Sequence, residues 1–284
     1  MLRLLSIELH KIRYNKASKV LTIIYFGLLT CIALMAAIRF DFAGFRFDIT
    51  TTGIFNFPYI WHFNTWVAST IKFFLLLVIV SMTANEYSYK TLKQNLIDGI
   101  SKKEFILSKF ITVVLFALVS TLFVFVVSFI LGLMYSDYTE LSIIFTDFQY
   151  LLGFFVKLLG FFSFGLFAGM WVKRSAFAVG AMVVWWFIEG IVKIVIAISL
   201  GTAGKQDLIV ETMDKVMRYF PFESMSNLIK EPFTRLGAVK SVANQVGEQF
   251  NKNHDVQFLD VLIVLIWTSI FIYGSYALLK KRDL

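Results

Sequence analysis

Four ionisable residues stand inside otherwise apolar stretches of the sequence: Lys72, Lys157, Glu189 and Lys193. A charged side chain at the centre of a bilayer costs about 2.5–3.5 kcal/mol on insertion scales, so such residues either line a translocation path or form buried pairs. Glu189 and Lys193 are four residues apart, which places them on one helix face, where they can neutralise each other. One acid and three lysines do not make a proton relay, so we favour structural pairing or snorkelling over a path lining.

Signals for catalysis and nucleotide binding are weak. The segment Gly204-Lys205-Gln206 is a near match to the phosphate-binding loop G-x-x-x-x-G-K-[ST], but Ser199 replaces its first glycine and Gln206 its last residue. The three histidines are far apart in the sequence: His10, His62 and His254. They form no obvious metal triad, and a single cysteine excludes a cysteine-based metal site. We therefore expect a chain that is not an enzyme and binds no metal or cofactor of its own.

The composition identifies the environment in which these residues lie. Of the 284 residues 58% are hydrophobic and only 16% are charged, and the mean hydropathy is +0.75. Soluble domains average about 45–50% apolar and about 25% charged residues. The formal charge of +8 would suggest nucleic acid for a soluble protein, but here the cations flank apolar runs. The sequence predicts an all-α, polytopic membrane protein that does not bind nucleic acid.

Six stretches are long and apolar enough to span the hydrocarbon, which takes about 20 residues. They run near 20–38, 61–83, 105–134, 150–172, 176–200 and 259–279. Residues 1–19 place Leu2, Leu5 and Leu9 on one helix face, which predicts an amphipathic helix at the membrane interface. The three prolines lie outside all six stretches, which argues against broken helices. Trp185 and Trp186 fall mid-span, where packing is favoured over substrate contact.

The distribution of Lys and Arg sets the orientation. One side of the membrane holds 1–19, 84–109, 173–175 and 280–284, with 15 Lys and Arg. The other side holds 39–60, 135–149 and 201–258, with nine in a longer total length. Cytoplasmic loops carry the excess of cations, so both termini are expected in the cytoplasm. The 201–258 loop is then extracytoplasmic, and its apolar clusters predict short helices.

The polar segment 84–104, between the second and third spans, is the most specific feature. Tyr89, Leu92, Leu96 and Ile97 make a short amphipathic helix, and Gly99 is placed to end it. Ser101 is followed three residues later by Glu104, which is the pattern of a capping box at the start of the next helix. A compact helical elbow of this kind can transmit force from a soluble partner, although an ordinary loop helix would have the same pattern.

With this segment, the chain resembles the permease family of ABC type-2 exporters over nearly its whole length. That family often carries Glu, a Thr after a small residue, Gly or Pro before Ser-Arg, and Lys at the re-entry point. The matching residues here are Glu86, Thr91, Gly99, Ser101 and Lys109, with Glu8, Lys11, Tyr276 and the closing Lys281-Arg282-Asp283 elsewhere in the chain. Two positions depart from the pattern. Lys90 stands where the family often has Gly, and Lys102-Lys103 replace the arginine, which keeps the charge but not its planar fork.

The resemblance implies the membrane-spanning subunit of an ATP-driven exporter in a bacterial cytoplasmic membrane. It implies a separate ABC ATPase subunit that binds ATP and Mg, and a second permease subunit, identical or related. The cargo stays open among peptide, lipid-like and other amphipathic molecules. The residues expected to couple to the ATPase are Glu86, Tyr89, Lys90, Thr91, Leu92, Lys93, Leu96, Gly99, Ser101, Lys102 and Lys103.

Two other functions remain open on the sequence. The chain could be a membrane anchor or assembly scaffold for a partner ATPase, without transport of its own. It could also be an integral lipid-modifying enzyme, but the spans lack the cluster of His and acidic residues that such an enzyme would need.

Overall fold

The computed structural model describes residues 2–36, 40–42, 45–47, 53–236 and 253–282. Within these ranges the chain is helical apart from an antiparallel pair of short strands, β1 (Phe40–Phe42) and β2 (Phe45–Phe47). The helices are α1 (Leu2–Tyr14), α2 (Lys16–Ala36), α3 (Tyr59–Ile71), α4 (Phe73–Ser88), α5 (Thr91–Ile97), α6 (Lys102–Tyr135), α7 (Leu141–Ile144), α8 (Gln149–Val172), α9 (Ser175–Thr202), η2 (Gln206–Leu208), α10 (Ile209–Met217), α11 (Pro221–Asn227), η3 (Phe233–Arg235) and α13 (Phe258–Lys280).

The predicted all-helical membrane fold is confirmed. Five helices are long and apolar enough to cross a membrane: α2, α6, α8, α9 and α13. The sixth candidate span consists of α3 and α4, which meet at Lys72 with a bend of 45°. The inference against broken helices was wrong here, because the chain bends at Lys72 without a proline.

Helix α8 forms the centre of the bundle and contacts α3, α4, α6, α9 and α13. Its glycines make this close packing possible. A Cβ on Gly160 would lie 2.7 Å from Val264 of α13, and one on Gly165 would overlap Leu76 of α4. Because lipid tails are as apolar as leucine, membrane helices associate largely by close van der Waals packing, which small residues allow.

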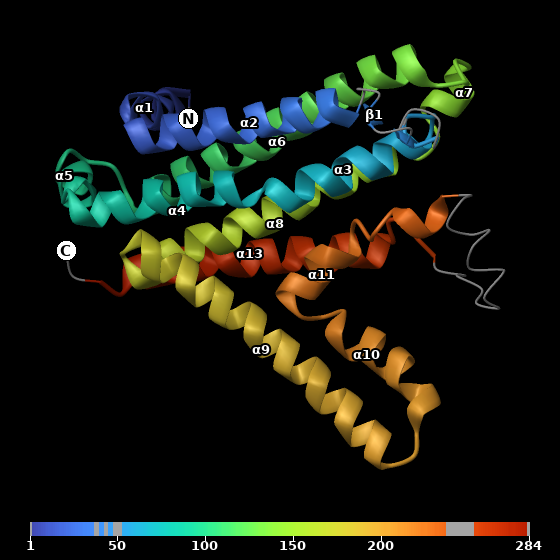
Figure 1. Ribbon diagram of the computed structural model, residues 1–284. Coiled ribbons are helices and arrows are strands. Elements are labelled where there is room, and N and C mark those ends of the chain that lie inside the picture. The colour runs from blue at the N-terminus through green and yellow to red at the C-terminus, as the bar shows by residue number, and fades with distance from the viewer. Residues whose placement is uncertain (1, 37–39, 43–44, 48–52, 237–252, 283–284) are drawn as a thin grey trace.

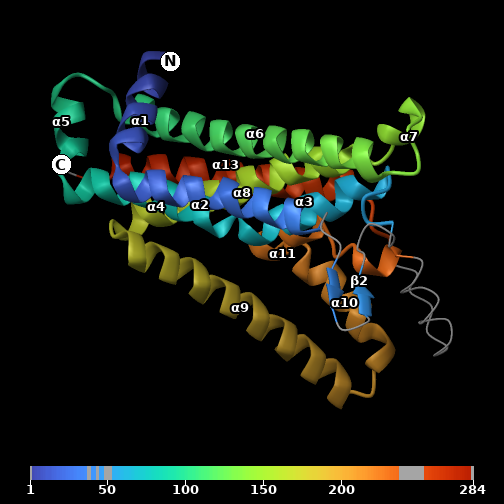
Figure 2. The same ribbon diagram turned by 45° about the horizontal axis from the view of Figure 1, so that its top comes forward.

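Helix α9 diverges from the bundle and forms an arm with α10, as Figures 1 and 2 show. Its buried residues are few: Ala178, Met182 and Glu189. After η2, α10 returns toward the bundle and α11 packs on α8, α9 and α13. The prediction of short helices within 201–258 is thus confirmed where the structure describes this segment; 237–252 lie outside the described residues.

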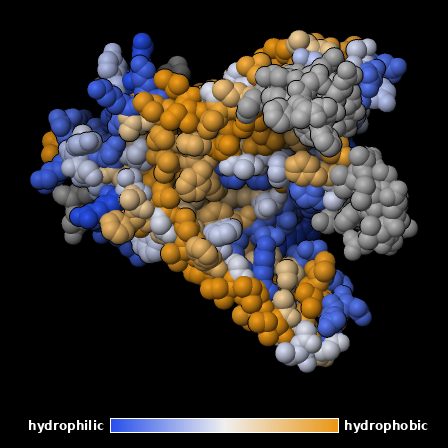
Figure 3. All heavy atoms as spheres, in the orientation of Figure 1, coloured by the Kyte–Doolittle hydropathy of each residue, from blue (hydrophilic) through white to orange (hydrophobic). Residues whose placement is uncertain are grey.

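The two ends of the bundle carry different elements. Helices α1 and α5 and the last turn of α13 lie at one end, whereas α7 and the β1–β2 hairpin lie at the other (Figures 1 and 2). Hydrophobic residues cover the middle of the face seen in Figure 3, and hydrophilic residues gather at the end that carries α1 and α5. This distribution is that of a protein whose midsection faces lipid.

Candidate functional site

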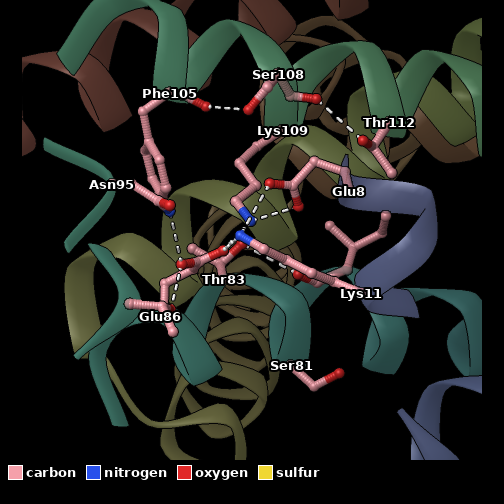
Figure 4. A network of polar contacts seen from close by, with 12 residues as sticks. Glu8, Lys11, Ser81, Thr83, Glu86, Asn95, Phe105, Ser108, Lys109 and Thr112 are labelled. Carbon is pink, nitrogen blue, oxygen red and sulfur yellow. Dashed lines mark hydrogen bonds and ion pairs between the residues drawn. The ribbon is translucent and has the colours of Figure 1, made fainter. Parts of the chain in front are cut away.

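A network of buried charges holds the elbow between α4 and α6 (Figure 4). Lys109 of α6 is fully buried, and its Nζ lies 2.5 Å from Oε2 of Glu8 and 2.6 Å from Oε1 of Glu86. Glu8 belongs to α1 and Glu86 to the last turn of α4, so one ammonium group joins three helices. Both carboxylates are themselves almost completely buried. Buried charges of this kind are tolerated only when they are paired and hydrogen-bonded.

Lys11 of α1 completes the network. Its Nζ lies 2.9 Å from Oε1 of Glu86 and 3.6 Å from Oε1 of Glu8. Burial lowers the pKa of Lys11, but the two nearby carboxylates outweigh this effect and hold its pKa above the usual value. Two carboxylates and two ammonium groups therefore balance one another at the junction of α1, α4 and α6.

The second oxygen of Glu86 fixes the short helix α5. Thr91 donates its hydroxyl to Glu86 Oε2 at 2.5 Å, and Asn95, one turn further along α5, donates its amide to the same oxygen at 3.4 Å. Glu86 thus binds α1 and α6 with one oxygen and α5 with the other. Through this carboxylate α5 is connected to α1, α4 and α6.

Local backbone signals set the two ends of α5. Lys90, directly before the helix, adopts a left-handed conformation with φ 57°. At the other end Gly99 has φ 93°, its N–H bonds to Leu96 O, and the Ile100 N–H bonds to Asn95 O. These two bonds form a Schellman motif, which favours glycine at this position. Ser101 and Glu104 then form the predicted capping box at the start of α6.

The backbone at Lys90 gives a first prediction. A left-handed conformation costs a non-glycine residue about 1–2 kcal/mol, whereas glycine adopts it freely. We expect Lys90→Gly to stabilise the elbow by about 1 kcal/mol, and Lys93→Gly, inside α5, to destabilise it by a similar amount. Hydrogen exchange of the α5 amides in the purified protein measures both effects. Faster exchange in Lys90→Gly than in the unchanged protein would contradict this explanation.

An apolar cluster lies under α5. Leu92 is only 2% exposed and packs with Phe105, Ile106, Met170 and Leu279. Leu96 is half-buried against the same cluster. Among the residues expected to couple to the ATPase, these two leucines therefore attach the elbow to its own bundle.

Other residues of the elbow face outward. Tyr89 is 72% and Ile97 75% exposed, and Lys90, Lys93 and Lys103 are also exposed. Lys102 differs from these lysines, since its Nζ donates to the carbonyl of Arg282 at 3.0 Å, beyond the end of α13. The free surface of the elbow thus presents two large apolar side chains and three lysines, together with the exposed acids Asp98 and Glu104.

The sequence matches the family described as ABC-2 family transporter protein over residues 4–284. The chain belongs to this family. No curated protein matches it at a significant level. The protein is therefore a multi-pass membrane subunit of an ABC-2 transporter, of the kind that lacks an ATPase domain, and the resemblance seen in the sequence is confirmed.

The structure of this ABC-2 subunit joins the motif residues that the sequence scatters. Glu8, Lys11, Glu86, Thr91 and Lys109 all belong to one hydrogen-bonded network. Asn95 is not among the residues that the sequence pattern predicts, although its position one turn after Thr91 could have indicated a shared partner.

In the sequence, Arg282 stands out only as part of the closing Lys281-Arg282-Asp283. It bonds to the Tyr87 hydroxyl and to the carbonyls of Met170 and Trp171, and so connects the end of α13 to α4 and α8. Nothing in the spacing of the sequence could have indicated these contacts between distant segments.

The intramembrane residues Glu189 and Lys193 have separate partners in the ABC-2 subunit. Lys193 Nζ lies 2.5 Å from Oε2 of Glu223, in α11. Glu189 accepts hydrogen bonds from the indole of Trp185 and from the backbone N–H groups of Phe222 and Glu223. Both side chains thus hold α11 against α9, and sequence spacing missed this because Glu223 comes from a segment outside the spans.

Proposed function

We propose that this chain is the membrane-spanning subunit of an ATP-driven exporter in a bacterial cytoplasmic membrane, coupled to a separate ATPase through the α4–α5–α6 elbow. The observation that carries the proposal is the double attachment of Glu86. One of its oxygens binds Lys109 and the other binds Thr91. Helix α5, which lies at the surface of the elbow, is therefore expected to move together with α4 and α6. A loop that only connected two spans would not need a buried ion network at its base.

The mechanism follows from this attachment. The ATPase binds ATP and Mg and contacts the exposed surface around Tyr89 and Ile97. Acidic groups on the ATPase pair with Lys90, Lys93 and Lys103, which orients the contact. When the ATPase closes around nucleotide, it pulls α5. The elbow then tilts α4 and α6 together. The bend at Lys72 lies at the opposite end of α4 from the elbow.

The complete transporter in this proposal has two permease subunits and two ATPase subunits, as the family architecture implies. The exposed apolar side chains of α9 face either lipid or the second permease subunit, identical or related. The cargo crosses from the cytoplasmic side, where α1, α5 and the end of α13 lie together, to the side of α7.

A substitution on the exposed surface tests the docking. We expect Ile97→Asp to reduce co-purification of the ATPase at least about tenfold, because interface centres lose about 2 kcal/mol or more when an apolar anchor is removed. The fold should persist, since Ile97 is exposed. Leu141→Asp is the matched control: it is equally exposed, but α7 lies at the opposite end of the bundle. Equal recovery of the ATPase with both variants would overturn the docking proposal.

A transport measurement separates an exporter from a scaffold. Inverted vesicles that contain both subunits should accumulate cargo with ATP and lose this activity with Ile97→Asp. Binding of the ATPase without any flux, over a panel of peptide, lipid and glycan cargoes, would favour the function of a membrane anchor instead.

A further inference from the structure

Two adjoining cavities open between the α9–α10 arm and the bundle. The first, about 730 Å³, is lined mainly by apolar side chains, among them Phe161, Trp186, Phe187 and Phe222. The second, about 1040 Å³, is lined largely by polar residues, among them Asp214, Arg218, Asn253 and Gln257. In Figure 3 the surface is hollowed between the arm and the bundle, with hydrophilic residues inside the hollow. The volumes are those of ligand sites, which usually measure about 300–1,000 Å³.

Two lysines stand where the cavities meet. Lys72 and Lys157 line both of them. Lys157 is only 5% exposed, and its Nζ reaches a single carbonyl, that of Ile229, at 3.4 Å. Lys72 donates to the carbonyl of Ser69 at 2.7 Å and lies over the ring of Phe161. Within the described part of the chain neither ammonium group has a carboxylate partner.

Four of the five acids that line these cavities already have a partner: Glu189, Glu223, Asp260 and Glu231, the last of which accepts from Thr234. Among the described residues, the fifth, Asp214, makes no ion pair with Lys72 or Lys157. Glu189 accepts three hydrogen bonds, and Glu223 pairs with Lys193. Asp260, on the polar side, pairs with Arg218. Two neighbouring cations at membrane depth without a counter-charge are costly and mark a functional site.

We propose that this cleft binds an acidic amphiphile, with its phosphate or carboxylate on Lys72 and Lys157, its hydrocarbon in the apolar cavity and any further polar part in the second cavity. Such a ligand supplies the missing negative charge and buries its chain against aromatic side chains. This inference names the cargo class of the proposed exporter and rests on that function. Lys72 directly precedes α4, so the site lies at the start of that helix.

Fluorescence of the purified chain in phosphatidylcholine nanodiscs tests the site without the ATPase. The probe is dibromostearate, whose bromines quench Trp186 of the apolar cavity, and its uncharged counterpart is dibromostearyl alcohol. We expect saturable quenching by the acid, at least about tenfold weaker binding of the alcohol, and a smaller signal in Trp186→Phe. Charge-assisted hydrogen bonds have strengths that correspond to this ratio.

Lysine variants give the decisive comparison. Lys72→Met and Lys157→Met should each weaken binding of the acid at least about tenfold and leave the alcohol unchanged. Methionine removes a buried charge without leaving a void, so both variants should fold. Lys205→Gln, an exposed lysine beyond α9, is the control. Equal affinity for acid and alcohol, or unchanged affinity in both methionine variants, would refute the proposal.

Further measurements distinguish the source of the amphiphile and separate this inference from the proposed function. Displacement of dibromostearate by phosphatidylglycerol identifies a two-chain membrane lipid as the natural occupant, and displacement only by single-chain acids identifies a free amphiphile; either result supports the site. Loss of the site with intact ATP-driven flux of another cargo would remove this inference alone. Intact acid binding with no ATPase contact would remove the coupling proposal alone.

Discussion

Replacement of Lys109 by methionine is expected to destabilise the protein by about 3–5 kcal/mol, because it leaves two buried carboxylates with one remaining cation. Glu8 and Glu86 both lie within 2.6 Å of the Lys109 ammonium group, and neither can reach bulk water. The loss is a large fraction of the about 5–15 kcal/mol that typically separates folded from unfolded domains. Thermal unfolding of the purified protein in detergent should show a markedly lower midpoint, and α5 should lose its protection from hydrogen exchange.

Two further variants show whether charge is the cause. Lys103→Met removes an exposed lysine from the same helix and should change stability by less than about 0.5 kcal/mol. Lys109→Met combined with Glu8→Gln leaves Glu86 paired with Lys11, so it should recover part of the loss. A double variant that is no more stable than Lys109→Met would show that lost packing, and not unbalanced charge, causes the effect.

Replacement of Gly132 by alanine is expected to destabilise the bundle by about 1–3 kcal/mol through overpacking. A Cβ at this position of α6 would overlap three atoms of the Phe57 ring. That ring is buried and packs against Trp61 and Phe129, so it cannot move aside. The cost outweighs the gain of about 0.5–1 kcal/mol that alanine brings to a helix interior.

A second glycine provides the control for this prediction. Gly180 also lies within a long helix, but a Cβ there would have no neighbour within 4 Å. Gly180→Ala should therefore leave the unfolding midpoint unchanged or raise it. If both alanine variants unfold at the same temperature, close approach of Phe57 is not what requires glycine at position 132.

The sequence predicted most of the fold because spanning helices are read from length and apolarity alone. The expected 150–172 and 259–279 stretches differ from α8 and α13 by one residue at each differing end. The capping box at Ser101 was also predictable, since its pattern is local. The bend at Lys72 was not, because no proline or glycine marks it; both helices that meet there, α3 and α4, pack on α8.

The residues of the candidate site were predictable to the extent that their partners were local or followed the family pattern. Glu86, Thr91 and Lys109 were identified by their motif, but the sequence could not show that one carboxylate binds both of the others. Leu92 shows what such a pattern leaves open. An amphipathic pattern indicates an apolar face without saying whether the protein's own bundle or another protein covers it, and here it is the bundle.

The bend at Lys72 has a consequence for the energetics of the transporter. Helix α4 has 16 residues and is about 24 Å long, so a tilt of about 10° displaces its far end by about 4 Å. The elbow stands at one end of this lever and Lys72 at the other. Thermodynamic linkage is reciprocal: if closure of the motor alters affinity at Lys72 by some factor, a ligand held by Lys72 alters affinity for the motor by the same factor. Binding of a ligand at Lys72 would thus change the affinity of the membrane subunit for its ATPase.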